Sequence, residues 1–133
     1  MEHNMKILVV DDFSTMRQIT KNLLGDLGFS NIDEADDGLT ALPKLASGNF
    51  DFLITGWNMP GMEGIDLVKA VRADADLADL PVLMVTAEAR REQIVAAAAA
   101  GVNGYIVKPF TVQTLDEKIE RIFARHEVGA RPR

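Results

Sequence analysis

Four polar residues follow short apolar runs of this 133-residue chain, at points where strands would end. Asp11 and Asp12 follow the first run, Thr86 follows the fourth and Lys108 follows the fifth. Two carboxylates, a backbone carbonyl and waters suit Mg²⁺, which prefers an octahedron of oxygen ligands. A lysine directed at carboxylates neutralises their charge and that of a transferring phosphoryl group, and a hydroxyl can donate a hydrogen bond to a phosphoryl oxygen. We therefore predict one site for a divalent cation and a phosphoryl group.

Simpler interpretations of the same residues remain open at this point. Asp12 or Ser14 can cap the helix that is expected to follow, because their side-chain oxygens accept hydrogen bonds from the free N–H groups of a first turn. Thr86 can be a strand-end residue with a local hydrogen bond, and Lys108 an exposed loop lysine. Pro109 follows Lys108, and a cis peptide between them is one way to fix the direction of the lysine. The cluster as a whole favours the cation and phosphoryl site.

Position 56 holds a glycine where the surrounding pattern calls for an aspartate. The apolar run that ends at Thr55 leads into Gly56 and then into Trp57-Asn-Met-Pro-Gly61. Thr55 is expected on the opposite side of the strand, and Asp51 lies back along it by about 16 Å at about 3.3 Å per residue. Neither residue can replace a carboxylate at position 56, so the predicted site lacks a nucleophile.

The elements that must position these residues alternate in type along the chain. Short apolar runs separated by longer amphipathic ones are typical of a parallel sheet covered by helices on both faces. The predicted strands are Lys6 to Val10, Ile32 to Ala35, Phe52 to Thr55, Val82 to Val85 and Tyr105 to Val107. The predicted helices are Ser14 to Leu27, Leu39 to Ala46, Ile65 to Ala73, Arg90 to Ala100 and Val112 to Arg125. The fold class is therefore α/β, a doubly wound three-layer fold with a five-stranded parallel sheet, in which sites lie beyond the carboxyl ends of the strands.

Glycines and a proline mark the expected helix ends. Gly28, Gly48 and Gly101 each follow a predicted helix, and each is expected in the left-handed conformation that ends many helices. Pro43 lies inside the second helical pattern, where it is expected to kink or tighten the helix.

Composition and charge restrict the function further. The chain is 47% hydrophobic and has a net charge of -6, with a pI near 4.8. Its length suits one compact domain, and its acidic balance argues against nucleic acid as a partner. The chain has no cysteine, which excludes disulfides and thiolate chemistry. Its only N-terminal apolar run is too short for a signal-peptide core, and no segment approaches a membrane-spanning length, so we expect a cytoplasmic protein without a membrane partner.

Five motifs together resemble the receiver domain of response regulators, of the chemotaxis, CheY-like type. They are Val9-Val-Asp-Asp-Phe-Ser-Thr-Met-Arg17, Trp57-Asn-Met-Pro-Gly61, Val85-Thr-Ala-Glu88, Gly101-Val-Asn-Gly-Tyr105 and Val107-Lys-Pro-Phe110. The resemblance covers residues 5 to 125, and the ends 1–4 and 126–133 are expected to be flexible. It implies a flavodoxin-like fold with the strand order 2-1-3-4-5, which is the order of the CheY-like proteins themselves.

The resemblance assigns the metal site and the acceptor. Asp11 and Asp12 become the acidic pair that binds Mg²⁺, with the backbone carbonyl of Asn58 as a further ligand. Gly56 stands where the family has the phosphoacceptor aspartate, so phosphorylation is expected to be absent. Metal binding is expected to be weak or absent as well, because one of three carboxylates is missing.

The resemblance also assigns the switch and the partners. Thr86 becomes a switch hydroxyl, Lys108 a phosphoryl contact, and Tyr105 an aromatic side chain that moves between buried and exposed states. The implied partners are a chemotaxis-type sensor histidine kinase, the flagellar motor switch protein and a phosphatase. We expect a monomer that is not itself an enzyme.

Other functions remain as alternatives. A phosphorylation-independent module that acts by binding or competing for partners fits the same sequence. Haloacid-dehalogenase-type phosphatases use Asp-x-Asp where this chain has Asp11-Asp12-Phe13, and a flavin phosphate would be repelled by an acidic pair after the first strand. Gly56 is either an engineered substitution or a natural loss, and the intact state of the other motifs favours engineering or a recent change.

Overall fold

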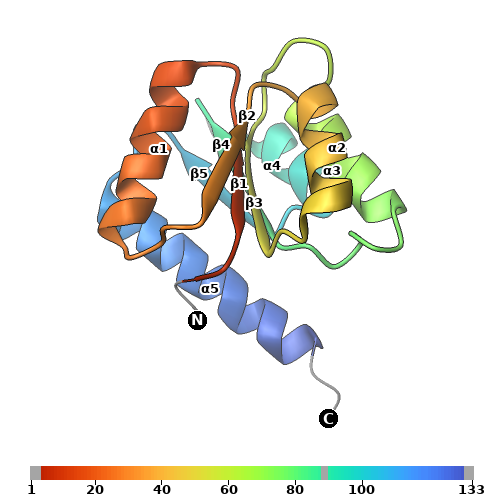
Figure 1. The fold of residues 1–133 in the computed structure, drawn as a ribbon. Coiled ribbons are helices and arrows are strands. Elements are labelled where there is room, and N and C mark those ends of the chain that lie inside the picture. The colour runs from red at the N-terminus through yellow and green to blue at the C-terminus, as the bar shows by residue number, and fades with distance from the viewer. Residues whose placement is uncertain (1–3, 88–89, 131–133) are drawn as a thin grey trace.

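The computed structural model describes residues 4–87 and 90–130, in which strands and helices alternate along the chain (Figure 1). The strands are β1 (Ile7–Val10), β2 (Ile32–Ala35), β3 (Phe52–Gly56), β4 (Val82–Thr86) and β5 (Gly104–Val107). The helices are α1 (Ser14–Asp26), α2 (Gly38–Gly48), α3 (Gly64–Ala73), α4 (Arg91–Ala100) and α5 (Val112–Ala130). Every predicted element is present: half of the ends coincide with the prediction, and all the others but the end of α5 are shifted by one or two residues.

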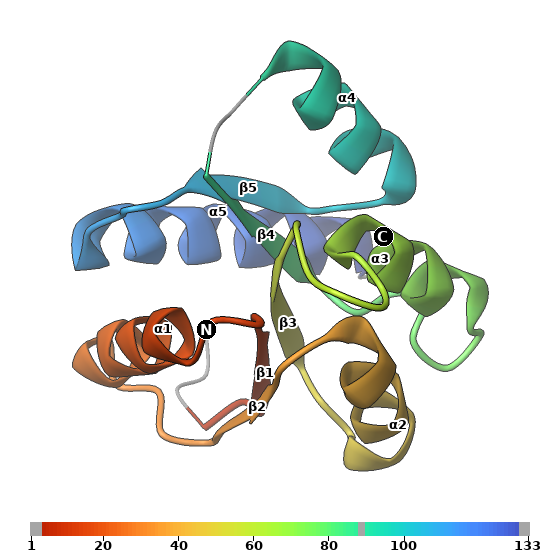
Figure 2. The ribbon, with the colours of Figure 1, turned by 90° about the horizontal axis from the view of Figure 1, so that it is seen from above.

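All strand pairs are parallel, and the five strands lie in the order β2-β1-β3-β4-β5. Viewed from above, α1 and α5 lie on one side of the sheet, and α2, α3 and α4 lie on the other (Figure 2). The predicted doubly wound fold and its strand order are confirmed. In the pairing register Val10 lies beside Thr55, and Gly56 lies beside Val85, so the ends of the central strands are level with one another.

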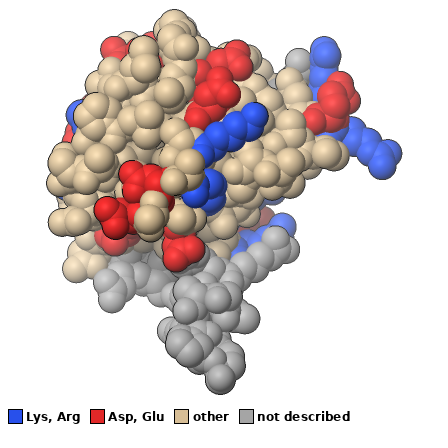
Figure 3. All heavy atoms as spheres, turned by 90° about the vertical axis from the view of Figure 1, so that its right-hand side faces the viewer, with Lys and Arg blue, Asp and Glu red and all other residues tan. Residues whose placement is uncertain are grey.

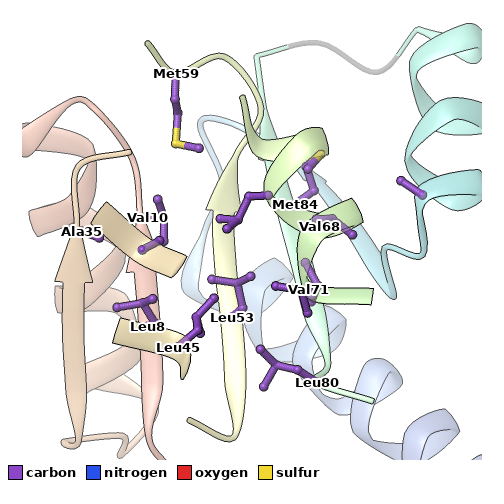
Figure 4. Close-up of a cluster of buried hydrophobic side chains, with 14 of the residues drawn as sticks. Leu8, Val10, Ala35, Leu45, Leu53, Met59, Val68, Val71, Leu80 and Met84 are labelled. Atoms are coloured by element: carbon purple, nitrogen blue, oxygen red, sulfur yellow. The ribbon is translucent and has the colours of Figure 1, made fainter. Parts of the chain in front are cut away.

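The sheet separates two hydrophobic layers, because successive side chains of a strand point to opposite faces. Leu8 and Leu53 pack on the side of α2, α3 and α4, where Figure 4 shows them among other buried side chains. Ile7 and Ile54 pack on the side of α1 and α5. The central strands β1, β3 and β4 are buried along their whole length, which explains their nearly continuous apolar sequences.

Of the three glycines expected in the left-handed conformation at helix ends, two adopt it and one does not. Gly28 and Gly101 are left-handed as expected, with φ of 96° and 104°. Gly48 is instead the last residue of α2, and Asn49 takes the left-handed conformation with φ of 54°. Among residue types, glycine adopts this conformation most readily. Asparagine also adopts it often, because its short polar side chain can form local hydrogen bonds.

The last helix is longer than predicted. It continues past Arg125 and ends at Ala130, so residues 126–130 are helical in backbone. Pro43 lies inside α2 as expected, and the hydroxyl of Ser47 donates a hydrogen bond to its carbonyl oxygen. Of the helices in the described ranges, none is both long and apolar enough to cross a bilayer.

Candidate functional site

Asp11 is the buried acid at the end of β1, with 5% of its surface exposed. Its Oδ1 accepts a hydrogen bond of 2.9 Å from the backbone N–H of Phe13, and its carbonyl oxygen accepts one of 2.7 Å from Arg17. Phe13 is the N-cap of α1 and makes no side-chain capping bond. The alternative in which Asp12 or Ser14 caps this helix is therefore wrong, since the N-cap position falls between them.

Gly56 ends β3 directly opposite this acid. A Cβ atom built on Gly56 would lie 3.5 Å from Oδ2 of Asp11 and 3.7 Å from the carbonyl oxygen of Val10, which are ordinary contacts. The φ angle of Gly56 is outside the left-handed region. Neither backbone conformation nor space therefore requires glycine here, and a side chain at this position would point toward Asp11.

The neighbours of Gly56 do not bring a carboxylate to its position. The buried hydroxyl of Thr55 donates a hydrogen bond of 3.0 Å to the Gly56 carbonyl oxygen. Asp51 lies at the start of β3, where its carboxylate accepts a hydrogen bond of 2.7 Å from the backbone N–H of Lys6. The prediction that Asp51 lies far back along the strand from position 56 is confirmed, because Lys6 directly precedes β1.

A small cavity of about 40 Å³ lies between the ends of β1, β3, β4 and β5. Its lining residues are Asp11, Gly56, Trp57, Asn58, Val85, Thr86, Ala87 and Lys108. The Nζ atom of Lys108 lies 3.9 Å from Oδ2 of Asp11, and the backbone N–H of Lys108 donates a hydrogen bond of 2.8 Å to the Thr86 carbonyl oxygen. The fold thus gathers residues that sequence reasoning placed at one edge of the sheet.

Not every predicted residue lies in this cavity. Asp12 is exposed and is not among the lining residues. The Lys108–Pro109 peptide is cis, as the sequence suggested. Glu88, which belongs to the motif that follows Thr86, lies outside the described residues.

The electrostatics of the site centre on Asp11. Burial raises the pKa of this carboxyl, and the nearby negative charge of Asp12 acts in the same direction. The Phe13 N–H and the ammonium group of Lys108 oppose the increase in pKa without cancelling it. The charged form of Asp11 is therefore short of compensating positive charge, which a bound cation would supply.

Three charged residues, Arg17, Lys21 and Glu34, form a network of hydrogen bonds next to Asp11. Arg17 binds both the Asp11 carbonyl oxygen and, at 2.7 Å, the Glu34 carboxylate. The Nζ of Lys21 donates a hydrogen bond of 2.6 Å to the same carboxylate. The hydrogen bonds from Lys21 and Arg17 lower the pKa of Glu34, with Lys21 the larger cause. Sequence reasoning did not find Arg17, although its position one turn into the helix after the acidic pair is the available signal.

Gly64 is another residue that sequence reasoning missed. Its backbone N–H donates a hydrogen bond of 2.8 Å to the Trp57 carbonyl oxygen. A Cβ atom on Gly64 would overlap the carbonyl oxygen of Gly56, so only glycine lets the start of α3 approach the end of β3 this closely. The Trp57 to Gly61 loop is therefore fixed beside the cavity.

Tyr105 lies beside the site rather than in it. Its ring packs edge-on against Trp57, with 6.5 Å between ring centroids, and Trp57 itself lines the cavity. Tyr105 also lines a larger groove of about 610 Å³ between α4, β5 and α5, together with Ile94, Ile106, Val107 and Phe110. Trp57 thus connects the cavity with this outer groove.

The oxygen donors around Asp11 suit a hard cation, although they are few. Across residues 4–87 and 90–130, no group of three acidic, histidine or cysteine side chains could hold a metal ion. Mg²⁺ is commonly bound through one or two carboxylates and keeps several waters. Asp11, Asp12 and the Asn58 carbonyl oxygen fit that kind of site, and the cation would supply positive charge at the buried acid.

Comparison with known proteins decides the family. The family model described as response regulator receiver domain matches residues 7–120. The chain is a response-regulator receiver domain. The receiver domain is 75% identical over 121 residues to the chemotaxis protein CheY of Pseudomonas aeruginosa, covering 91% of this chain and 98% of the relative. It is 72% identical over 122 residues to CheY-3 of Vibrio cholerae, covering 92% and 94%.

Solved structures agree on the fold. CheY4 of Vibrio cholerae matches with a TM-score of 0.83 at 38% identity, covering 90% of this receiver domain and 98% of that chain. The receiver domain of the Pseudomonas aeruginosa sensor histidine kinase PA1611, described with a magnesium ion coordinated in its active-site cleft, matches with a TM-score of 0.82 at 23% identity, covering 91% and 98%. The identities to the chemotaxis proteins make this receiver domain CheY-like.

Proposed function

We propose that this receiver domain is a chemotaxis regulator of a two-component phosphorelay that binds its partners but accepts no phosphoryl group. One observation carries the proposal: a side chain at Gly56 would enter the cavity that Asp11, Thr86 and Lys108 line. Transfer from a kinase histidine requires an oxygen nucleophile to attack phosphorus while the histidine nitrogen leaves. Glycine offers no such oxygen, so no acyl phosphate forms at position 56.

The remaining residues keep roles that do not depend on the acceptor. Asp11, Asp12 and the Asn58 carbonyl oxygen hold Mg²⁺ weakly, because Gly56 contributes no carboxylate to the site. Lys108 neutralises negative charge in the cavity, and its distance of 3.9 Å from Asp11 supports this role. Thr86 and Tyr105 act as switch residues. The protein acts through binding rather than as an enzyme.

The partners of this function are proteins. A chemotaxis-type sensor histidine kinase, the flagellar motor switch protein and a phosphatase are the expected partners of a cytoplasmic monomer. The contact between Trp57 and Tyr105 supports communication between the cavity and the groove of α4, β5 and α5. On the face that Figure 3 shows, Lys and Arg side chains lie among Asp and Glu side chains, which fits a protein that does not bind nucleic acid.

Labelling with a small phosphodonor tests the proposal. The chain and its Gly56→Asp and Gly56→Asn variants are incubated with radiolabelled acetyl phosphate and Mg²⁺. We expect label on Gly56→Asp only, removable by hydroxylamine as an acyl phosphate should be. Gly56→Asn is the matched control, because it has the shape of aspartate without a nucleophilic carboxylate. A hydroxylamine-sensitive label on the unsubstituted chain would disprove the proposal.

A second candidate function is a phosphorylation-independent binding module. The observation in its favour is that the outer groove of about 610 Å³ is formed although position 56 has no acceptor. Binding of a motor-switch peptide to Gly56→Asp, with and without acetyl phosphate, separates the two functions. Phosphate-dependent affinity supports the regulator, whereas equal affinity in both conditions supports the binding module.

A further inference from the structure

We propose that the cavity beside Gly56 binds a small monocarboxylate, such as formate or acetate, together with a divalent cation. The carboxylate of the small molecule would take the place of the carboxylate that position 56 lacks. This inference rests on the proposed cation site at Asp11 and Asp12. It adds a ligand class that the receiver domain would bind without covalent attachment.

The size of the cavity fits such a molecule. Its volume is about 40 Å³, whereas about 10–15 Å³ measured in this way is enough for one water molecule. A Cβ atom on Gly56 would have no neighbour closer than 3.5 Å, so the space for the first atom of a side chain is already present. The part of an aspartate that glycine lacks has four non-hydrogen atoms, the same number as acetate, and formate is one atom smaller.

Half of the residues that line the cavity are polar, and the cavity is reachable from solvent. Thr86 and Asp11 are nearly buried, whereas Asn58 is exposed and Lys108 keeps about a third of its side chain exposed. A cavity with several polar partners holds water, unlike a closed apolar void, and a small ion would take the place of that water. The outer side at Asn58 and Lys108 provides the entrance.

Charge makes the binding of the two ligands cooperative. Without metal, a monocarboxylate would lie near the Asp11 carboxylate, and two such charges about 5 Å apart repel strongly even at an effective dielectric near 20. A divalent cation changes the combined formal charge of Asp11, Asp12 and Lys108 from one negative to one positive. The monocarboxylate should therefore bind well only with the cation present.

Linkage requires the effect to be reciprocal. If Mg²⁺ tightens the binding of formate by some factor, formate must tighten the binding of Mg²⁺ by the same factor. Couplings between ligands are typically about 5- to 150-fold. We expect saturating formate to lower the Kd of Mg²⁺ by at least about fivefold, the lower end of that range.

Trp57 provides the measurement, because it is the only tryptophan of the chain and it lines the cavity. Its fluorescence is recorded during MgCl₂ titrations in sodium formate, sodium pivalate or sodium chloride at equal ionic strength. Pivalate has the same charge as formate but is too large for the cavity. We expect a lower Kd of Mg²⁺ in formate and equal Kd values in pivalate and chloride.

The Gly56→Asp variant is the matched control. Its own carboxylate occupies the cavity, so formate should leave its Kd of Mg²⁺ unchanged. Gly56→Ala keeps the position uncharged but fills part of the space, so its response to formate should be smaller than that of the unsubstituted chain. In amide NMR spectra, formate added with Mg²⁺ should shift the signals of Trp57, Thr86 and Ala87 in the unsubstituted chain.

Each contrary result has a distinct meaning. If Gly56→Asp binds Mg²⁺ tightly while formate has no effect on the unsubstituted chain, the inference is wrong and the proposed cation site stands. If neither protein responds to Mg²⁺, the cation site itself is wrong, and the inference falls with it. Equal effects of formate and pivalate would show a general ionic effect and would also overturn the inference.

Discussion

The carboxylate of Asp11 is held in its charged form by few partners. A single backbone N–H group and a lysine 3.9 Å away oppose the effects of burial and of Asp12. A raised pKa in the folded state means that stability falls as pH rises from the ordinary value of 3.8 through the raised value. Ionised Asp11 therefore lowers the free energy of unfolding at neutral pH.

The Asp11→Asn variant should be more stable than the parent chain at pH 7 without Mg²⁺, by on the order of 1 kcal/mol. Asparagine keeps the oxygen that accepts the Phe13 N–H and removes the buried charge. The gain should shrink as pH falls toward 3.8, where Asp11 of the parent chain becomes protonated. Urea unfolding at several pH values measures the difference.

Glu34→Gln is the control, because its effect on the free energy of unfolding should have the opposite sign. The pKa of Glu34 is lowered by Lys21 and Arg17, so its charged form contributes stability above 4.5 that is lost as pH falls through the lowered pKa. This variant should be less stable than the parent chain at pH 7. A gain for Glu34→Gln, or a loss for Asp11→Asn, would contradict the assignment of these charges.

An aspartate at position 56 should destabilise the metal-free protein. In Gly56→Asp, carboxylates about 5 Å apart repel by roughly 3 kcal/mol at an effective dielectric near 20, and Lys108 offsets part of this. Removing glycine from a strand returns about 0.5–1 kcal/mol. We expect the variant to lose up to about 2 kcal/mol without Mg²⁺ in urea titrations, and to regain it in Mg²⁺. A variant clearly more stable than the parent chain in EDTA would refute this.

At the scale of elements, two glycines of helices α1 and α4 differ in what they can tolerate. Gly25 lies in α1, is exposed, and would have no atom within 4 Å of an added Cβ. Gly101 is the C-cap of α4 with φ of 104°, and an added Cβ would lie 2.8 Å from Nε of Arg72. That arginine donates hydrogen bonds of 3.1 and 2.8 Å to the Gly101 carbonyl oxygen, so it cannot move away without losing them.

Alanine at the two positions should act in opposite directions. Gly25→Ala should raise the free energy of unfolding by about 0.5–1 kcal/mol, because alanine is the better helix former. Gly101→Ala should lower it by at least about 1 kcal/mol, since a left-handed conformation is costly for alanine. Thermal unfolding followed by circular dichroism compares both variants with the parent chain. Equal effects at both positions would mean that helix propensity alone decides, contrary to the structure.

At the scale of the whole molecule, the sheet joins the two hydrophobic layers into one cooperative unit. Neighbouring residues of β3, such as Leu53 and Ile54, are both fully buried but belong to different layers. Of the two hydrophobic layers, Trp57 packs against the one beside α2, α3 and α4 and not against the other. A loss in one layer is therefore transmitted through the shared strands.

Leu53→Ala and Ile54→Ala should each lower the free energy of unfolding by about 2–5 kcal/mol. Both should shift a single urea transition that has the same midpoint by Trp57 fluorescence and by circular dichroism. The Ile54→Ala variant is the informative one, because its cavity lies on the face away from Trp57. A Trp57 transition unaffected by Ile54→Ala would show that the layers unfold separately.

Much of this molecule could be predicted from its sequence, because strands buried on both faces have short apolar runs and helices have amphipathic ones. The strand ends also placed Asp11, Thr86 and Lys108 at one edge before any geometry was known. Features that depend on tertiary approach could not be predicted. Gly64 is required only because the Gly56 carbonyl oxygen lies against it, and the exclusion of Asp12 as a cap depends on where α1 begins.

Gly56 and Gly64 are neighbours in space, but they differ in whether substitution by another residue is sterically allowed. The carbonyl oxygen of Gly56 excludes any side chain at position 64, whereas position 56 itself has an allowed conformation and an open place for a Cβ atom. A glycine codon that ends in a pyrimidine becomes an aspartate codon by a single base change. From such a codon, a change to aspartate at position 56 would therefore need one base change and would meet no steric barrier in the fold.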